Sequence, residues 1–239
     1  MACMIAAAAD ARADDSARFR ALVKRAPAIS SIRADIVQHI KQGDGPTATY
    51  RGSYIADHTG RFRIDYHAPE RQVVLFSRNK LIWYFPEQRV AYEYSGGPPR
   101  GNTPGMFPLA QFRNVSGNGY SVTYCGRHMA GIFTVVDVYR LRDKKRNIVI
   151  EIWVDPGRNT VIRKTVKSRD DVEVMQESYS SFTEISGAIL PTGIRVDMRT
   201  DNGIQSSVTR YSNIRINTGN RPGVFRLDLP PGVSRRAGK

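Results

Sequence analysis

Few residues in this chain have the types and spacing that catalysis requires. The histidines lie on expected strands or turns, outside any HExxH or GxSxG context: His39, His58, His67 and His128. Asp170, Asp171 and Glu173 fall together in an expected turn, where solvated carboxylates are the ordinary finding. No glycine-rich run joins a strand to the start of a helix, as a phosphate-binding loop would. The sequence therefore contains no recognisable catalytic site, and we expect a protein that is not an enzyme.

The cysteines argue against a metal site and against a disulfide framework. The chain has two, Cys3 and Cys125, and neither belongs to a CxxC or Cys/His pattern typical of zinc sites. We therefore expect neither a metal ion nor a cofactor.

The formal net charge of +14 indicates an anionic partner or serves solubility. Along residues 61–67, Phe62, Ile64 and Tyr66 alternate with Arg61 and Arg63, so aromatic and basic side chains face opposite sides of a strand. A stacking surface for single-stranded nucleic acid needs both kinds on one side. We therefore expect no nucleic acid partner, whereas anionic lipid headgroups and acidic protein surfaces are candidate partners.

The first residues, MACMIAAAADARA, resemble the end of a secretory signal peptide, because small apolar residues precede an A-x-A pattern at 11–13. We interpret residues 1–13 as a signal-peptide remnant, with a disordered Ala-rich leader as the alternative. No other apolar run approaches the ~18 residues of a membrane span. We expect an exported, soluble protein.

Residues 14–16, Asp-Asp-Ser, are typical of a helix start. Phe19, Leu22 and Val23 follow at helical spacing, and Pro27 ends the pattern. This predicts a short amphipathic helix that packs on a sheet or covers it as a mobile lid.

The rest of the chain is organised around residues 49–94, which hold five short runs of alternating apolar and polar residues separated by turns. Further strands are expected at 31–41, 119–125, 132–141, 147–155, 160–168, 172–184, 192–200, 204–216 and 224–227. A Pro- and Gly-rich insertion at 95–112 cannot be a central strand.

These patterns predict one mainly β domain over residues 14–233, followed by a disordered tail at 234–239. A sheet of about 11–13 antiparallel strands must curl or close. We expect an open, strongly curved half-barrel, with the N-terminal helix and the short helical or Pro-rich insertion acting as its lid.

Four motifs stand out along the chain: GRFRIDY at 60–66 before Pro69, LIWYF at 81–85 before Pro86, GNTP at 101–104 before Met106 and Phe107, and FRL at 225–227 before PPGV at 230–233. In their order and spacing they resemble the LolA family, the carriers of outer-membrane lipoproteins in the periplasm, which implies the same location for this protein. The resemblance covers residues 16–116 and the C-terminus, and an extra hairpin or two lies between 145 and 200. The chain is thus similar to a divergent or extended lipoprotein-sorting relative.

The resemblance implies an incomplete barrel whose concave apolar face shelters acyl chains. It assigns one set of residues to the wall of this hydrophobic cavity: Phe62, Ile64, Tyr66, Leu81, Trp83 and Phe85. It assigns a second set to the lid: Leu22, Met106, Phe107 and Leu109. His58 stands where the family has a lid-latching arginine, and is the candidate latch. The alternation fixes which residues share a face, whereas the resemblance decides which face is concave.

Such a carrier would bind acylated lipoproteins as a monomer and exchange them with an inner-membrane lipoprotein-releasing transporter and an outer-membrane acceptor. Exposing one acyl chain of about 15 methylenes to water costs about 12 kcal/mol, at ~0.8 kcal/mol per methylene, so release from a membrane requires shelter. Two alternatives remain. One is a lipid- or lipoprotein-sensing or receptor module of the cell envelope. The other is an enzyme acting on an apolar substrate, which would need a polar cluster on the concave face.

Overall fold

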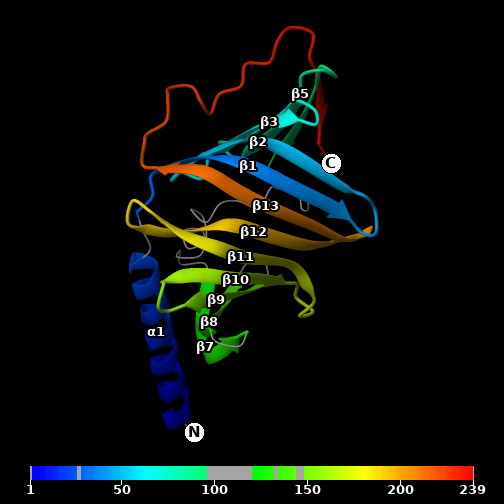
Figure 1. The fold of residues 1–239 in the computed structure, drawn as a ribbon. Coiled ribbons are helices and arrows are strands. Elements are labelled where there is room, and N and C mark those ends of the chain that lie inside the picture. The colour runs from blue at the N-terminus through cyan, green and yellow to red at the C-terminus, as the bar shows by residue number, and fades with distance from the viewer. Residues whose placement is uncertain (1, 26–27, 96–119, 132–133, 144–147, 239) are drawn as a thin grey trace.

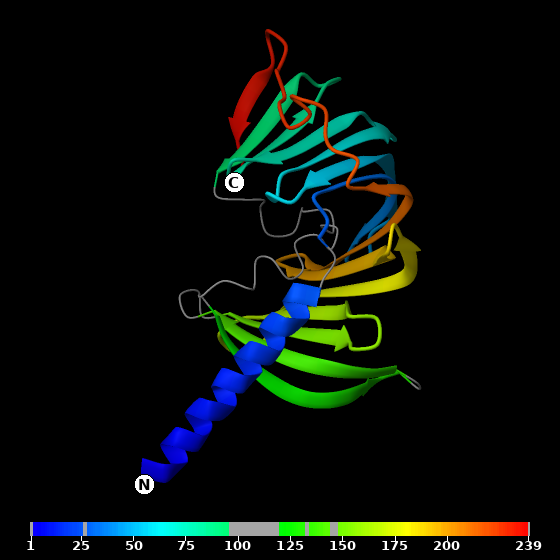
Figure 2. The same ribbon diagram turned by 90° about the vertical axis from the view of Figure 1, so that its left-hand side faces the viewer.

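The computed structural model describes residues 2–25, 28–95, 120–131, 134–143 and 148–238. Within these ranges the chain forms one helix, α1 (Ala2–Arg25), and a single sheet of fourteen strands. The expected fold class is confirmed, because the protein is mainly β and its sheet is curved and open (Figures 1 and 2). Most of the expected insertion at 95–112 lies outside the described residues.

Thirteen of the fourteen strands form two antiparallel meanders. The first holds β1 (Ser31–Gln42), β2 (Thr47–Asp57), β3 (Phe62–Ala68), β4 (Gln72–Ser77), β5 (Lys80–Phe85) and β6 (Val90–Ser95). The second holds β7 (Tyr120–Ala130), β8 (Thr134–Asp143), β9 (Val149–Asp155), β10 (Thr160–Lys167), β11 (Glu173–Ile185), β12 (Ala188–Thr200) and β13 (Gly203–Ile216). The two meanders meet where β1 pairs with β13, in the middle of the sheet.

The curvature of the sheet creates a concave side. Figure 2 shows the strands bent into a C, with α1 at its open side. Register shifts interrupt the pairing within β1, β2, β7 and β10. Each such bulge bends its strand and increases the local twist, so a sheet of this width curls without closing.

Helix α1 begins at Ala2, so the helix start expected at residues 14–16 is wrong. The preceding stretch is rich in alanine, the strongest helix former, and contains neither glycine nor proline, so the helix extends upstream of the two aspartates. The helix ends at Arg25, before Pro27, with Lys24 and Arg25 in its last turn where cations are favourable. The interpretation of residues 1–13 as a signal-peptide remnant stays a prediction.

Two expectations for the C-terminus are also wrong. Residues 224–227, expected as a strand, do not form one: a turn covers residues 222–225, and Arg226 N donates to Gly223 O at 2.8 Å. Residues 234–237, expected in a disordered tail, form β14 (Ser234–Ala237), which pairs in parallel with β6. The backbone groups of β6 would otherwise be unpaired at the sheet edge, and β14 satisfies them.

Candidate functional site

The concave side of the sheet carries one continuous cluster of buried apolar side chains. In β3, Phe62, Ile64 and Tyr66 are buried in this cluster, while their neighbours in the strand are not. The Phe62 ring stacks on Phe76, with 5.5 Å between centroids, and on Tyr54 at 6.5 Å. The alternation in the sequence thus separates the core face of β3 from its outer face, as predicted.

Strand β5 contributes the other three predicted wall residues. Leu81 is buried, and Trp83 is half-buried against the same cluster, with its Nε1 donating to Gln72 Oε1 at 2.9 Å. Phe85 is half-buried and stacks on Trp83 at 5.4 Å between centroids. Of the six predicted wall residues, Trp83 and Phe85 are the two that keep appreciable exposure, so a ligand would meet them first.

The apolar cluster continues across the second meander, to which the sequence analysis assigned no site residue. Its main members there are Val122, Tyr139, Leu141, Ile150, Ile152, Val154, Val161, Tyr179, Leu190, Ile194 and Val196. The signal was present in the sequence: in VIEIWVD at 149–155, every second residue faces this core. The apolar face therefore extends over both halves of the sheet.

An uncharged polar group lies within this cluster. Tyr66 Oη donates to Gln38 Oε1 at 2.6 Å, and Gln38 Nε2 donates to Ser207 Oγ at 2.9 Å. Burial, with a smaller contribution from the neighbouring Tyr50, raises the pKa of Tyr66 well above its usual value. The phenol therefore stays protonated and remains a hydrogen-bond donor.

A second polar group carries charge. Lys164 Nζ lies 3.0 Å from Glu177 Oε1, and Tyr179 Oη donates a short hydrogen bond to the other carboxylate oxygen of Glu177. Glu177 points to the concave side, because it lies two residues from Tyr179, a member of the apolar cluster. The concave face thus holds the kind of polar cluster that an enzyme would need, but its three side chains are bonded to one another.

Helix α1 is fixed to the edge of the second meander by contacts from its C-terminal half. Phe19 is buried, and its ring lies 5.3 Å from that of Tyr139. Asp15 Oδ2 accepts a hydrogen bond from Tyr124 N at 3.0 Å, and the Arg18 guanidinium lies 4.3 Å from the centroid of the Tyr124 ring. The helix therefore extends from β7 and β8 toward the open side of the sheet (Figure 2).

The predicted lid residue Leu22 lies in this docked helix and is buried in the apolar cluster together with Phe19. The other predicted lid residues, Met106, Phe107 and Leu109, lie outside the described residues.

Comparison with known proteins identifies the architecture. No family model matches the sequence, and no curated protein matches it. Among solved structures, a LolA superfamily protein from Nitrosomonas europaea matches with a TM-score of 0.60 at 14% identity, over 86% of this chain and 94% of that one. The chain has a LolA-like fold.

Two further structures extend this LolA-like match. A domain from Vibrio parahaemolyticus named for outer membrane lipoprotein sorting matches with a TM-score of 0.69 at 10% identity, over 90% of this chain and 97% of that one. A DUF1329 family protein from Desulfovibrio piger matches with a TM-score of 0.66 at 17% identity, over 90% and 96%. Since these matches cover nearly all of each chain, the LolA-like fold includes the second meander. At such identities they show the fold alone.

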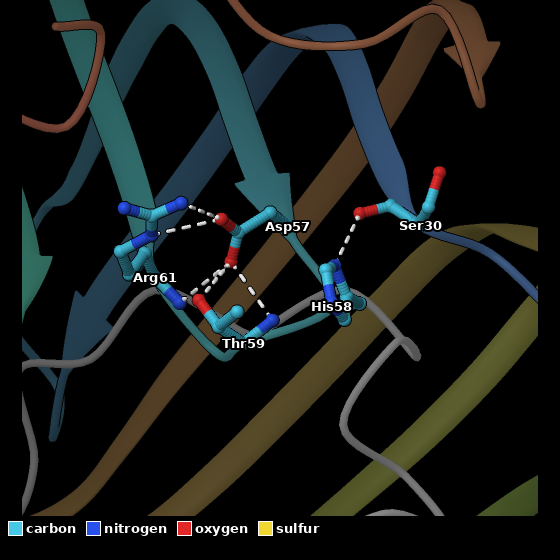
Figure 3. Close-up of polar contacts among 5 residues, drawn as sticks. All are labelled: Ser30, Asp57, His58, Thr59 and Arg61. Carbon is cyan, nitrogen blue, oxygen red and sulfur yellow. Dashed lines mark hydrogen bonds and ion pairs between the residues drawn. The ribbon is translucent and has the colours of Figure 1, made fainter.

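The candidate latch, His58, lies in the turn between β2 and β3 and is exposed. Its backbone N donates to Ser30 O at 2.9 Å, and its Nδ1, in the tautomer that carries a proton there, donates to the same oxygen at 3.3 Å (Figure 3). His58 thus ties this turn to the residue that precedes β1. Its role as a latch in the LolA-like fold stays a prediction.

Asp57, the residue before His58, organises this turn. It was not among the predicted site residues. Asp57 Oδ1 accepts hydrogen bonds from Thr59 N, Thr59 Oγ1 and Arg61 N at 2.9, 2.6 and 3.2 Å (Figure 3). Its Oδ2 accepts from Arg61 Nε at 2.8 Å and pairs with Arg61 Nη2 at 2.5 Å. An Asp at the start of a turn, with Thr two residues later, was the available signal.

The environment of Asp57 changes its acidity. Burial by itself raises the pKa of Asp57, but the hydrogen bonds from Thr59 and Arg61 and the Arg61 charge outweigh it and hold the pKa below its usual value of 3.8. The ionised carboxylate is therefore favoured by the fold.

The described residues contain no group of three His, Cys, Asp or Glu side chains arranged to hold a metal ion. No helix in the described part of the chain is both long enough and apolar enough to cross a membrane.

The lowered pKa of Asp57 predicts a pH-dependent contribution to stability. Because the folded pKa lies below 3.8, the carboxylate stabilises the fold above that pH, and the contribution is lost as the pH falls through the folded pKa. We expect the difference in free energy of unfolding between wild type and Asp57→Asn to shrink between about pH 5 and pH 2. Urea unfolding at a series of pH values measures it, with Asp44→Asn in an exposed turn as the control. A difference that does not vary with pH contradicts this account.

The docking of α1 predicts that its C-terminal half detaches when the Phe19 ring is removed. We expect Phe19→Ala to increase amide hydrogen exchange in residues 15–25 by at least about tenfold, because a buried aromatic side chain contributes a few kcal/mol. Arg20→Ala, at an exposed position of the same helix, is the matched control and should leave exchange nearly unchanged. Equal exchange in both variants would show that the Phe19 contact does not hold the helix.

Proposed function

We propose that this protein is a periplasmic carrier that shelters the acyl chains of lipoproteins against its concave face and moves them from the inner to the outer membrane. The observation that carries the proposal is the single apolar cluster that spans the concave side of an open sheet and includes two side chains of α1. The LolA-like fold and the name of the Vibrio relative support it.

The physical need for such a face follows from the chemistry of the client. Exposing one acyl chain of about 15 methylenes to water costs about 12 kcal/mol of free energy. Three such chains together exceed the ~18–21 kcal/mol at which non-covalent affinity saturates. Loading and unloading by simple diffusion is therefore too slow, and we propose an inner-membrane releasing transporter and an outer-membrane acceptor as partners.

We propose that the wall of the acyl site is formed by Phe62, Ile64, Tyr66, Leu81, Trp83 and Phe85. Leu22 then belongs to a lid that includes α1, and Met106, Phe107 and Leu109 belong to the same lid. His58, bonded to Ser30 beside the start of β1, would act as the latch. Residues 1–13 fit an export signal, which would place the carrier in the periplasm.

The charged group on the concave face fits an acylated ligand better than a substrate to be turned over. Lys164, Glu177 and Tyr179 satisfy one another's hydrogen bonds, so none is left as a free nucleophile or base. Lys164 and Glu177 remain 23% and 16% exposed, so they can meet the polar ester and amide groups where acyl chains join a lipoprotein. We therefore propose a carrier without catalytic activity.

The two tryptophans of the chain allow a direct test of which face binds acyl chains. Trp83 lies at the apolar cluster, whereas Trp153 points to the outer face, where the Arg163 guanidinium lies 4.7 Å from its ring centroid. Trp153→Phe leaves Trp83 as the one fluorophore of this type, and Trp83→Phe leaves Trp153. Both substitutions are conservative, so both proteins should fold.

We expect a lipopeptide with brominated acyl chains to quench the fluorescence of Trp153→Phe and to leave that of Trp83→Phe nearly unchanged, because bromine quenches only at contact. The same lipopeptide without bromine controls for changes in environment. Quenching of Trp153 instead would move the binding site to the outer face. Absence of quenching in both proteins would overturn the carrier proposal.

A further inference from the structure

The outer face of the sheet carries a pocket beside the C-terminal segment, residues 217–233, which follows β13. This segment runs along the outer side of the first meander (Figures 1 and 2). Arg63 Nη1 donates to Val224 O and Arg226 O at 3.3 and 3.4 Å, which holds the segment against β3. The Arg61 guanidinium lies 4.7 Å from the centroid of the Phe225 ring.

The pocket between this segment and the outer face of β4 and β5 has a volume of about 740 Å³. A second pocket of about 370 Å³ adjoins it, and the two share Asn220 and Arg221. The larger volume is that of a small-molecule site and far exceeds the space of a single ion. It lies on the side of the sheet opposite to the proposed acyl site.

The charge of the two pockets is entirely positive. The cationic side chains that line them are Arg61, Arg78, Lys80, Arg221 and Arg226 in the larger pocket and Arg33, Arg215 and again Arg221 in the smaller one. Neither pocket has an aspartate or a glutamate among its described lining residues. An anion would therefore be attracted into the pocket from solution.

Three of these seven cations are already neutralised. Lys80 pairs with Glu93 at 2.5 Å, Arg226 pairs with Asp228 at 2.8 Å, and Arg61 pairs with Asp57. The other four, Arg33, Arg78, Arg215 and Arg221, form no ion pair within the described residues. In the larger pocket the unpaired guanidinium groups come from the sheet, at Arg78, and from the C-terminal segment, at Arg221, and such groups bind oxyanions.

Two polar atoms among the residues that line the smaller pocket form no hydrogen bond within the described part of the chain. Arg33 Nε and Asn220 Oδ1 are enclosed and have no hydrogen-bond partner among the described residues. Arg33 reaches the segment through one long contact, from its Nη2 to Gly219 O at 3.4 Å. The guanidinium of Arg33 is therefore not saturated by its own chain.

Apolar side chains line the larger pocket beside the cations. They are Leu75, Ile82, Val224, Phe225 and Leu227. A bare inorganic ion would leave this surface unused, whereas an ester would place its organic part against it. Phosphate suits the cationic end, because its oxygens accept paired hydrogen bonds from planar guanidinium groups.

We propose that this outer pocket binds a phosphate ester, with the phosphate group between Arg78 and Arg221 and the organic group against Leu75 and Ile82. The ester is either the headgroup of an anionic phospholipid in a membrane or a free phosphate ester, because both offer the same group. The site is independent of the acyl site, so one can fail without the other.

The test compares two double variants that remove the same charge. Arg78→Gln with Arg221→Gln removes the two unpaired arginines of the larger pocket, both at exposed positions. Arg51→Gln with Arg210→Gln removes two exposed arginines from the middle of the outer face, away from the pocket, and is the matched control. Thermal unfolding confirms that both proteins fold.

Binding is measured with three probes: inorganic phosphate, glycerol phosphate, and phosphatidylcholine vesicles that contain phosphatidic acid. We expect the pocket variant to lose at least about tenfold in affinity for whichever phosphate probe binds, since losing even one charge-assisted contact to phosphate weakens binding by about that factor. The control variant should lose less than about threefold.

The three probes distinguish the source of the phosphate group. Binding to vesicles that inorganic phosphate competes away supports the proposal with a lipid headgroup as the occupant. Binding of glycerol phosphate without vesicle binding supports it with a free ester. Equal losses in the two double variants, binding of inorganic phosphate alone with no gain from the organic group, or no binding of any probe to the wild type overturns it.

Discussion

The pairing of β1 with β13 is the contact on which the rest of the structure depends. It joins strands from opposite ends of the chain in one antiparallel ladder, with Ile36 opposite Tyr211. Side chains reinforce the junction on both faces: Gln38 bonds to Ser207 on the concave side, and Asn213 donates to Asp35 at 2.7 Å on the outer side. Without this pair the two meanders would be separate sheets, and neither would have a continuous apolar face.

Curvature and patterning together explain why this sheet can expose an apolar side to a ligand yet remain a folded domain. The bulged, twisted strands turn the apolar face inward, so water reaches it from one side, where α1 lies. Residues of the outer face alternate along each strand with those of the concave face. Charged side chains on the outer face include Arg63 and Asp65, which bond to each other at 2.8 Å. One face can thus serve an apolar ligand while the other offers cations to an anionic one.

The parts of the fold that depend on local pattern were predictable from the sequence, and those that depend on distant contacts were not. Alternation in residues 49–94 correctly predicted five strands and placed Phe62, Ile64 and Tyr66 on one face. Nothing local could reveal that β13 pairs with β1, or that residues 234–237 satisfy the edge of β6 instead of remaining free. The sequence pattern predicts a helix start at residues 14–16, because aspartates are favourable there. The preceding alanines favour a helix as well, and they extend α1 to Ala2.

The central claim, that the concave face shelters acyl chains, is tested most directly by native mass spectrometry with lipid extraction on protein purified gently from the cells in which it occurs naturally. The account predicts a bound acylated peptide or phospholipid in the wild type and in Ile55→Asp, whose side chain lies on the outer face between Arg33 and Arg63. It predicts loss of that ligand in Trp83→Asp. A wild-type protein that is free of ligand and takes up no added triacylated lipopeptide would contradict the account.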